Sequence, residues 1–184
     1  MIANDSSLSS IAFPAISAGV HRVPSDIVAK VMVAAVDDYL ASCPDSSLDR
    51  IDCVMWVNDV DNIRSFSQAV LQLLQPSEIF SGNCRNSSEE PGLVVQVMKG
   101  DITTEKVEGI VNSTANNLDM SSGLVSNAIL RAAGPKLQED CNSLVKKYGN
   151  LKLGEVRISF GHRLPAKHIL HVYANGETLD VAVP

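Results

Sequence analysis

The chain has 184 residues, and 15 Lys and Arg oppose 21 Asp and Glu for a formal net charge of −6. This length suits one globular domain or two incomplete ones. The acidic balance, without a basic cluster, argues against direct nucleic-acid binding. No stretch approaches the roughly 20 apolar residues that span a bilayer, and no secretory signal opens the chain, so we expect no membrane partner and a location in the nucleus or cytoplasm. The four cysteines show no C-x-x-C spacing, which fits a reducing compartment and no metal.

The first region predicts two strand–helix units. The apolar run 11–16 indicates a buried strand, and Pro24-Ser25-Asp26 begins a helix that stops before Pro44. The continuous apolar run 50–57 indicates a strand covered on both faces, with Trp56 in the core. Asp61 is expected to cap a second helix. Alternating strands and helices imply parallel pairing.

The second region begins after a turn-rich linker. We place the linker at 76–92 and expect strands at 93–98 and 109–112. One helix is expected around residues 125–132, and another follows Gly134-Pro135 and stops at Gly149. Two further strands are expected at 155–160 and 168–173; on the latter, His168 and His171 point to opposite faces, which disfavours a metal site.

Several motifs resemble those of the macrodomain, an ADP-ribose-binding module. Residues 94–173 resemble its N-terminal half, in segments that include Gly100-Asp-Ile-Thr103 and Ile110-Val-Asn-Ser-Thr114. Residues 10–74 resemble its C-terminal half, with Ser17-Ala-Gly-Val-His21 as a phosphate-binding loop. The resemblance implies a three-layer α/β fold, with a mixed, mostly parallel sheet and helices on both faces. The halves stand in permuted order: 1–75, the linker 76–92, then 93–173, before an atypical tail at 174–184.

The resemblance also implies where the ligand would lie. Asp101 would accept the adenine amine, and Ile102 would donate its backbone N–H; the alternative reading of Asp101 is a turn cap. A turn at 121–125, which keeps only one glycine of the family's three, would approach the distal ribose and diphosphate at a helix start. The full predicted set is Asp101, Ile102, Asn112, Ser122, Gly123, Val125, Ser17, Gly19, Val20 and His21.

Catalytic residues match the family less well than binding residues. Where family hydrolases carry a second Asn and an Asp, this chain has Ala115 and Ser126, although Asn116 or Asn117 would serve after a one-residue slip. We therefore expect no catalytic residue, no cofactor and no metal, and a reader of ADP-ribose or ADP-ribosylated proteins. The alternatives are an ADP-ribosyl hydrolase that uses Asn112 and Asn116, or a non-binding fragment of a larger ADP-ribosyltransferase.

The reversed order of the halves leaves two arrangements open. The chain resembles a junction of two macrodomains, as in tandem-macrodomain poly(ADP-ribose) polymerases of the B-aggressive-lymphoma type, or one circularly permuted macrodomain. In the second case the strand at 10–17 pairs with that at 109–112, and the strand at 50–57 pairs with that at 93–98. The family helix between the strand at 168–173 and the strand at 10–17 is missing, so apolar surface should be exposed.

Overall fold

A computed structural model describes residues 8–19, 22–43, 45–73 and 93–174. The strands are β1 (Ser10–Phe13), β2 (Arg50–Met55), β3 (Val94–Lys99), β4 (Gly109–Ser113), β5 (Val156–Phe160) and β6 (His168–Val172). The helices are α2 (Ser25–Ser42), α3 (Val60–Leu73), α4 (Leu124–Ala133) and α5 (Lys136–Tyr148), with the short 3₁₀ helix η1 (Ile102–Thr104). Among the described residues, no helix is long and apolar enough to cross a membrane.

Strands from both regions form one six-stranded sheet in the order β3-β2-β1-β4-β6-β5. β1 pairs in parallel with β4 through Ile11↔Gly109, which joins the two regions at the middle of the sheet. β2 pairs in parallel with β3 from Arg50↔Val94 to Met55↔Lys99. Both pairings were predicted and are confirmed. Only β5, at one edge, runs antiparallel, so the sheet is mixed and mostly parallel as expected.

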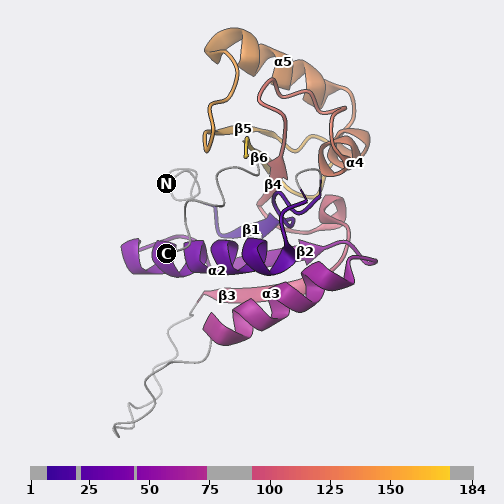
Figure 1. Cartoon of the computed structure of the whole chain (residues 1–184). Coiled ribbons are helices and arrows are strands. Elements are labelled where there is room, and N and C mark those ends of the chain that lie inside the picture. Colours follow the sequence, from indigo (N-terminus) through magenta and orange to yellow (C-terminus); the bar gives the residue numbers. More distant parts are fainter. Residues whose placement is uncertain (1–7, 20–21, 44, 74–92, 175–184) are drawn as a thin grey trace, which may run out of the picture.

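Helices cover the sheet on both faces, and alternate residues of each strand enter separate cores (Figure 1). Ala12, Val54, Ile110 and Ile169 face a core that includes Ile129 of α4 and Leu137 of α5. On the opposite face, Cys53 and Met55 pack with Val28 of α2 and Phe66 of α3. The rest of that face has its own cluster, with Ile11, Val111 and Leu170. The predicted three-layer α/β architecture is confirmed.

Single residues set several ends of the helices and strands, and two of these ends differ from the prediction. β1 ends at Phe13, because Pro14 has no backbone N–H to donate to a ladder. Asp59 caps α3, since its Oδ1 accepts from the Asn62 backbone N–H at 3.3 Å, so the expectation for Asp61 was wrong. Gly149 ends α5 as predicted, at φ 77°, where a side chain would be strained. The linker at 76–92 lies outside the described residues.

Candidate functional site

The order of the strands places a topological switch point at the carboxyl ends of β1 and β4, where a ligand-binding crevice is expected. After β1 the chain adds β2 and β3 on one side of this pair, by way of α2 and α3. After β4 it adds β6 and β5 on the other side, by way of α4 and α5. α2 and α4 therefore leave neighbouring parallel strands toward opposite faces of the sheet. In open α/β sheets, ligands bind outside the carboxyl ends of the strands at such a switch point.

The loop that follows β1 borders this crevice. Its backbone closes on itself, because Val23 N–H donates to Ser17 O and Arg22 N–H to Gly19 O, both at 3.3 Å. Ser17 has φ 66°, and an added side chain at Gly19 would meet no atom within 4 Å. Gly19 is thus free to let a ligand approach the backbone closely. Val20 and His21, also predicted site residues, lie outside the described residues.

The loop that follows β4 borders the crevice from the other side. It leads to Gly123, which precedes α4 with φ 91° and has open space around its α carbon. No side chain caps α4, so its first backbone N–H groups are left to water or a ligand. Ser122 and Gly123 are exposed and Val125 is half-buried. Unsatisfied amides with the positive end of the helix dipole favour an anion here.

Two buried hydroxyls accompany these loops. Ser17 Oγ and Thr114 Oγ1 have no hydrogen-bond partner within the described structure, and the two residues are 5% and 7% exposed. Ser17 follows β1 and Thr114 follows β4, so both lie at the carboxyl edge of the same strand pair. An unpaired buried polar group costs about 1–3 kcal/mol. Such a cost is repaid if a ligand or a water supplies the partner.

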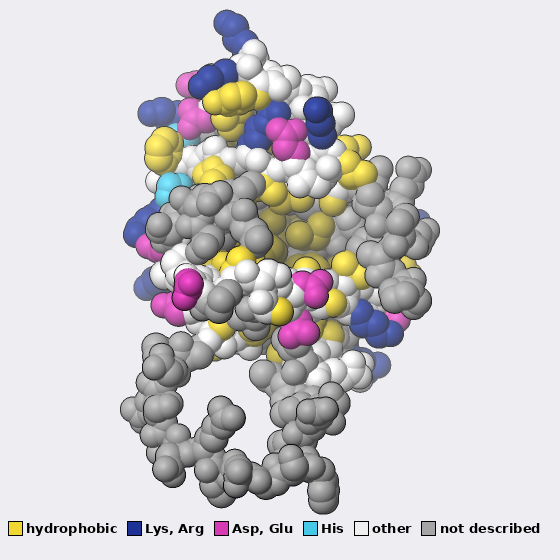
Figure 2. Space-filling model, turned by 90° about the vertical axis from the view of Figure 1, so that its left-hand side faces the viewer, with side chains coloured by type: hydrophobic (Ala, Val, Ile, Leu, Met, Phe, Trp, Pro, Cys, Tyr) yellow, Lys and Arg dark blue, Asp and Glu magenta, His cyan; other side chains and the backbone are white. Residues whose placement is uncertain are grey.

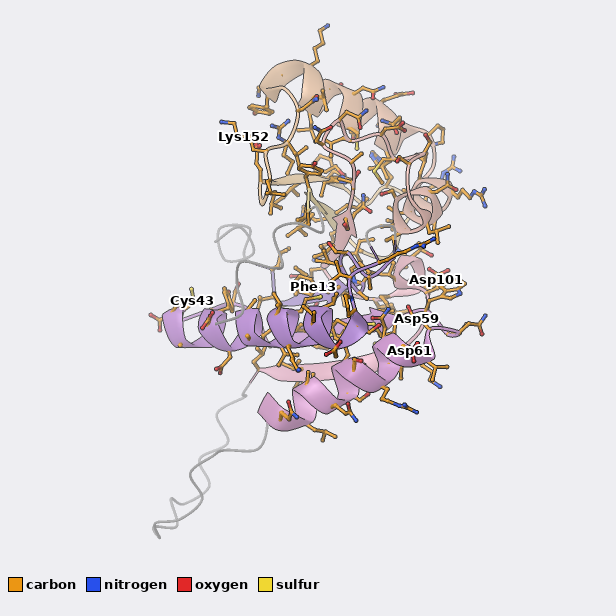
Figure 3. The ribbon with its side chains drawn as sticks, in the orientation of Figure 1. Phe13, Cys43, Asp59, Asp61, Asp101 and Lys152 are labelled. Carbon is orange, nitrogen blue, oxygen red and sulfur yellow. The ribbon has the colours of Figure 1, made fainter. Side chains whose placement is uncertain are left out.

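Asp101 and Ile102 lie at the carboxyl end of β3. Asp101 Oδ1 caps η1 by accepting from Thr103 N–H at 3.0 Å and Thr103 Oγ1–H at 2.8 Å. The turn-cap reading is therefore correct, and Asp101 Oδ2 makes no hydrogen bond within the described structure. The Ile102 side chain is buried in the core. Asp101 lies on the same side of the molecule as Asp59 and Asp61 (Figure 3).

Asn112 lies inside the protein, below the crevice. It is fully buried, its Oδ1 accepts from Ser126 Oγ at 3.0 Å, and its Nδ2 lies 3.2 Å from His171 Nδ1. His171 Nε2 in turn lies 2.8 Å from Ser159 Oγ. Burial lowers the pKa of His171 to about 4, so the ring is neutral at pH 7. Direct contact between Asn112 and a ligand requires it to give up one of these hydrogen bonds.

Trp56 is a site candidate that the sequence interpretation missed. It is 57% exposed, which contradicts its assignment to the core. β2 ends one residue earlier, and Gly100 N–H donates to Met55 O at 3.0 Å, so Trp56 follows β2 at the edge where Asp101 follows β3. The apolar run 50–57 does not reveal the exposure of Trp56, because an apolar residue just past the end of a strand cannot be told from one inside the strand by sequence alone.

A pocket of about 530 Å³ adjoins the loop after β1. Its walls include Ala18 and Arg22 from that loop, Asp26 from the first turn of α2, and Asp61 and Arg64 from α3. Cationic and anionic groups therefore line it together. Within the described residues, no group of three His, Cys, Asp or Glu side chains is placed to hold a metal ion.

The architecture of the sheet and its helices defines the class: the chain has the macrodomain fold. The structure of the Oryza sativa APL macrodomain in complex with ADP-ribose matches 90% of this chain and 78% of its own, with a TM-score of 0.70 and 22% identity. Residues 111–178 match the family model described as Macro domain.

Two curated relatives show how the resemblance is distributed. The human protein mono-ADP-ribosyltransferase PARP14 is 29% identical over 191 residues, which cover 93% of this chain and 10% of that protein. The ADP-ribose glycohydrolase MACROD1 of Rattus norvegicus is 42% identical over 77 residues, which cover 42% of this chain and 28% of that protein. The chain thus spans between a tenth and a third of the lengths of these two relatives.

Proposed function

We propose that this chain binds ADP-ribose, free or attached to proteins, in the crevice between β1 and β4. The observation that carries the proposal is the meeting of two open glycine turns and an uncapped helix start at one strand pair. A diphosphate needs backbone N–H donors at close range, and Gly19 and Gly123 allow that approach from both sides. The relative solved with ADP-ribose shares the fold and supports this choice of ligand.

The proposed pocket takes one wall from each region of the chain. Ser17 and Gly19 belong to the first region, whereas Asp101 and Gly123 belong to the second. The pairing of β1 with β4 supports a single unit whose halves stand in permuted order. In a longer protein with tandem modules, the same two regions would instead complete pockets with other partners.

The adenosine half of the ligand would lie near the ends of β2 and β3. Asp101 Oδ2 is the proposed acceptor for the adenine amine, since Oδ1 already caps η1. The exposed Trp56 offers a face on which a base can stack. In this proposal, adenine and diphosphate lie along the carboxyl edge of neighbouring strands.

Binding fits the residues better than hydrolysis does. Ser126 replaces the expected acid and its hydroxyl is engaged by Asn112 and Ser113 in the interior. Hydrolysis is the second candidate, because Asn116 and Asn117 are exposed in the loop after β4 and MACROD1 is a glycohydrolase in name. A role inside a larger ADP-ribosyltransferase is also proposed, from the resemblance to PARP14 over most of the chain.

Calorimetric titration with ADP-ribose tests the proposal. Saturable binding of one ligand per chain is the expected result, and ADP should bind while adenosine, which lacks the diphosphate, should bind much more weakly. Incubation with a mono-ADP-ribosylated peptide, followed by mass spectrometry, separates the two candidates. Release of ADP-ribose would favour the hydrolase, whereas no heat of binding would reject both.

A further inference from the structure

The pocket of about 530 Å³ lies where α2 and α3 begin, and these helices follow β1 and β2 in the chain. Its walls come from the loop after β1, from the first turn of α2 and from the beginning of α3. Since β1 and β2 are parallel neighbours, the pocket lies at the carboxyl edge of the sheet, on the α2–α3 side. Asp61, one of its wall residues, lies on the same side of the molecule as Asp101 (Figure 3).

Most charged groups of the pocket have no ionic partner within the described ranges. Arg22 and Arg64 are exposed and form no ion pair there. Asp61 forms none either in that part of the chain, although Arg64 follows it on α3. Asp26 has a cationic neighbour in Lys30, whose Nζ lies 3.8 Å from its Oδ2. Two guanidinium groups and one carboxylate are therefore left for a ligand.

The remaining walls add hydrogen-bonding groups. Ser25 and Ser65 are half-buried there, and no side chain caps α2, so the first N–H groups of this 18-residue helix are left to water or a ligand. At the opposite end of α2, by contrast, Figure 2 shows hydrophobic side chains gathered at mid-height. Guanidinium groups beside a helix start favour a phosphate, and a carboxylate beside them favours sugar hydroxyls. The lining therefore suits a ribose phosphate.

The position of the pocket relates it to one hydroxyl of the proposed ligand. In the proposed function, the diphosphate lies between the loops after β1 and β4, and adenine lies at the ends of β2 and β3. The adenosine ribose that joins them would then pass the ends of β1 and β2, and the segments that follow these two strands form the walls of the pocket. In poly(ADP-ribose) the next unit is attached to the 2′-oxygen of this ribose. A substituent at that oxygen would therefore enter the pocket.

We propose, as an extension that rests on the proposed function, that this pocket holds the ribose phosphate of a second ADP-ribose unit joined to the unit in the crevice. Arg22 and Arg64 would bind the phosphate, and Asp61 would accept hydrogen bonds from the ribose hydroxyls. A volume of about 530 Å³ is typical of small-molecule sites and exceeds what one phosphate group fills, which favours this larger group over a phosphate carried directly on the 2′-oxygen. The chain would thus bind linked ADP-ribose units more tightly than single ones.

Calorimetric titration of the full chain with three ligands tests this assignment: ADP-ribose, the purified ADP-ribose dimer and ADP-ribose 2′-phosphate. The dimer should bind about tenfold more tightly than ADP-ribose, because a guanidinium–phosphate contact is a charge-assisted hydrogen bond. Arg64→Gln should remove this advantage and leave the affinity for ADP-ribose unchanged. Arg131→Gln is the matched control, since Arg131 is also exposed but lies in the last turn of α4, and this variant should keep the advantage.

Equal affinities for the dimer and for ADP-ribose, or an advantage that Arg64→Gln retains, would overturn the assignment of the pocket and leave the proposed function standing. An absence of ADP-ribose binding would reject both. Tighter binding of ADP-ribose 2′-phosphate alone would overturn the second unit and assign the arginines to a phosphate on the nucleotide itself. The melting temperatures of Arg64→Gln and Arg131→Gln should agree, so that a lost advantage reports the pocket and not unfolding.

Discussion

Replacing Thr114 by Val should strengthen the fold and weaken the binding of ADP-ribose. Thr114 Oγ1 is buried without a partner, and Val has nearly the same shape with a methyl group in its place. Removing an unpaired hydroxyl should raise the free energy of unfolding by about 1 kcal/mol. If the bound ligand, or a water that it orders, is the missing partner, the loss of that hydrogen bond costs about 1.4 kcal/mol, a tenfold rise in Kd.

Urea denaturation and calorimetric titration of the same protein samples measure both effects. Ser159→Ala is the control. The Ser159 hydroxyl is also buried, but it lies on β5, away from the crevice, and it is 2.8 Å from Nε2 of His171. This control should lose about 1–3 kcal/mol of stability and keep its affinity, since it leaves a buried partner unpaired. A Thr114→Val protein that is less stable and binds ADP-ribose unchanged would show that the Thr114 hydroxyl is paired in the folded chain and plays no part in binding.

Three further predictions follow from the same geometry. Lowering the pH from 7 to 5 should lower the free energy of unfolding by about 2 kcal/mol through His171, because its pKa is about 4 in the folded protein and 6.5 in the unfolded chain, which therefore takes up the proton first. In urea denaturation at several pH values, His171→Asn should show a weaker dependence of stability on pH, and an unchanged dependence would assign it to other groups. Asp101→Asn should raise the Kd for ADP-ribose at least tenfold with little change in melting temperature, because an amide oxygen still caps η1; an unaltered Kd would remove Asp101 from the site. Trp56→Ala should leave stability within about 0.5 kcal/mol, since the ring is 57% exposed, but should cost about 1–3 kcal/mol of affinity if adenine stacks on it, and calorimetry would exclude that role if Kd stays constant.

The sequence determined the sheet better than the edges of the site. Apolar runs, alternation of apolar residues at 155–160 and helix signals predicted every described strand and the four long helices, because central strands buried on both faces have continuous hydrophobicity. The pairing of 10–17 with 109–112 came from family resemblance and not from local pattern. No periodicity in either segment indicates that strands about 100 residues apart are neighbours.

Residues at the ends of strands were harder to assign. Trp56 is one residue beyond β2, and its position in an apolar run led to the prediction of a core residue, whereas its ring is exposed. Asn112 shows the opposite error: its place in a family motif predicted a ligand contact, but in the structure its side chain points inward from β4 to Ser126 and His171. Whether a side chain faces a crevice or a core depends on where the strand stops, which sequence fixes only to within a few residues.

Backbone amide signals followed by NMR during a titration with ADP-ribose test whether loops from both regions bind one ligand. We expect the amides of Ser17 and Gly19 and those of Gly123 and Val125 to shift together, with one common Kd, because one diphosphate lies between loops from both regions. Shifts confined to one loop, or two different dissociation constants, would show that β1 and β4 do not border a shared pocket.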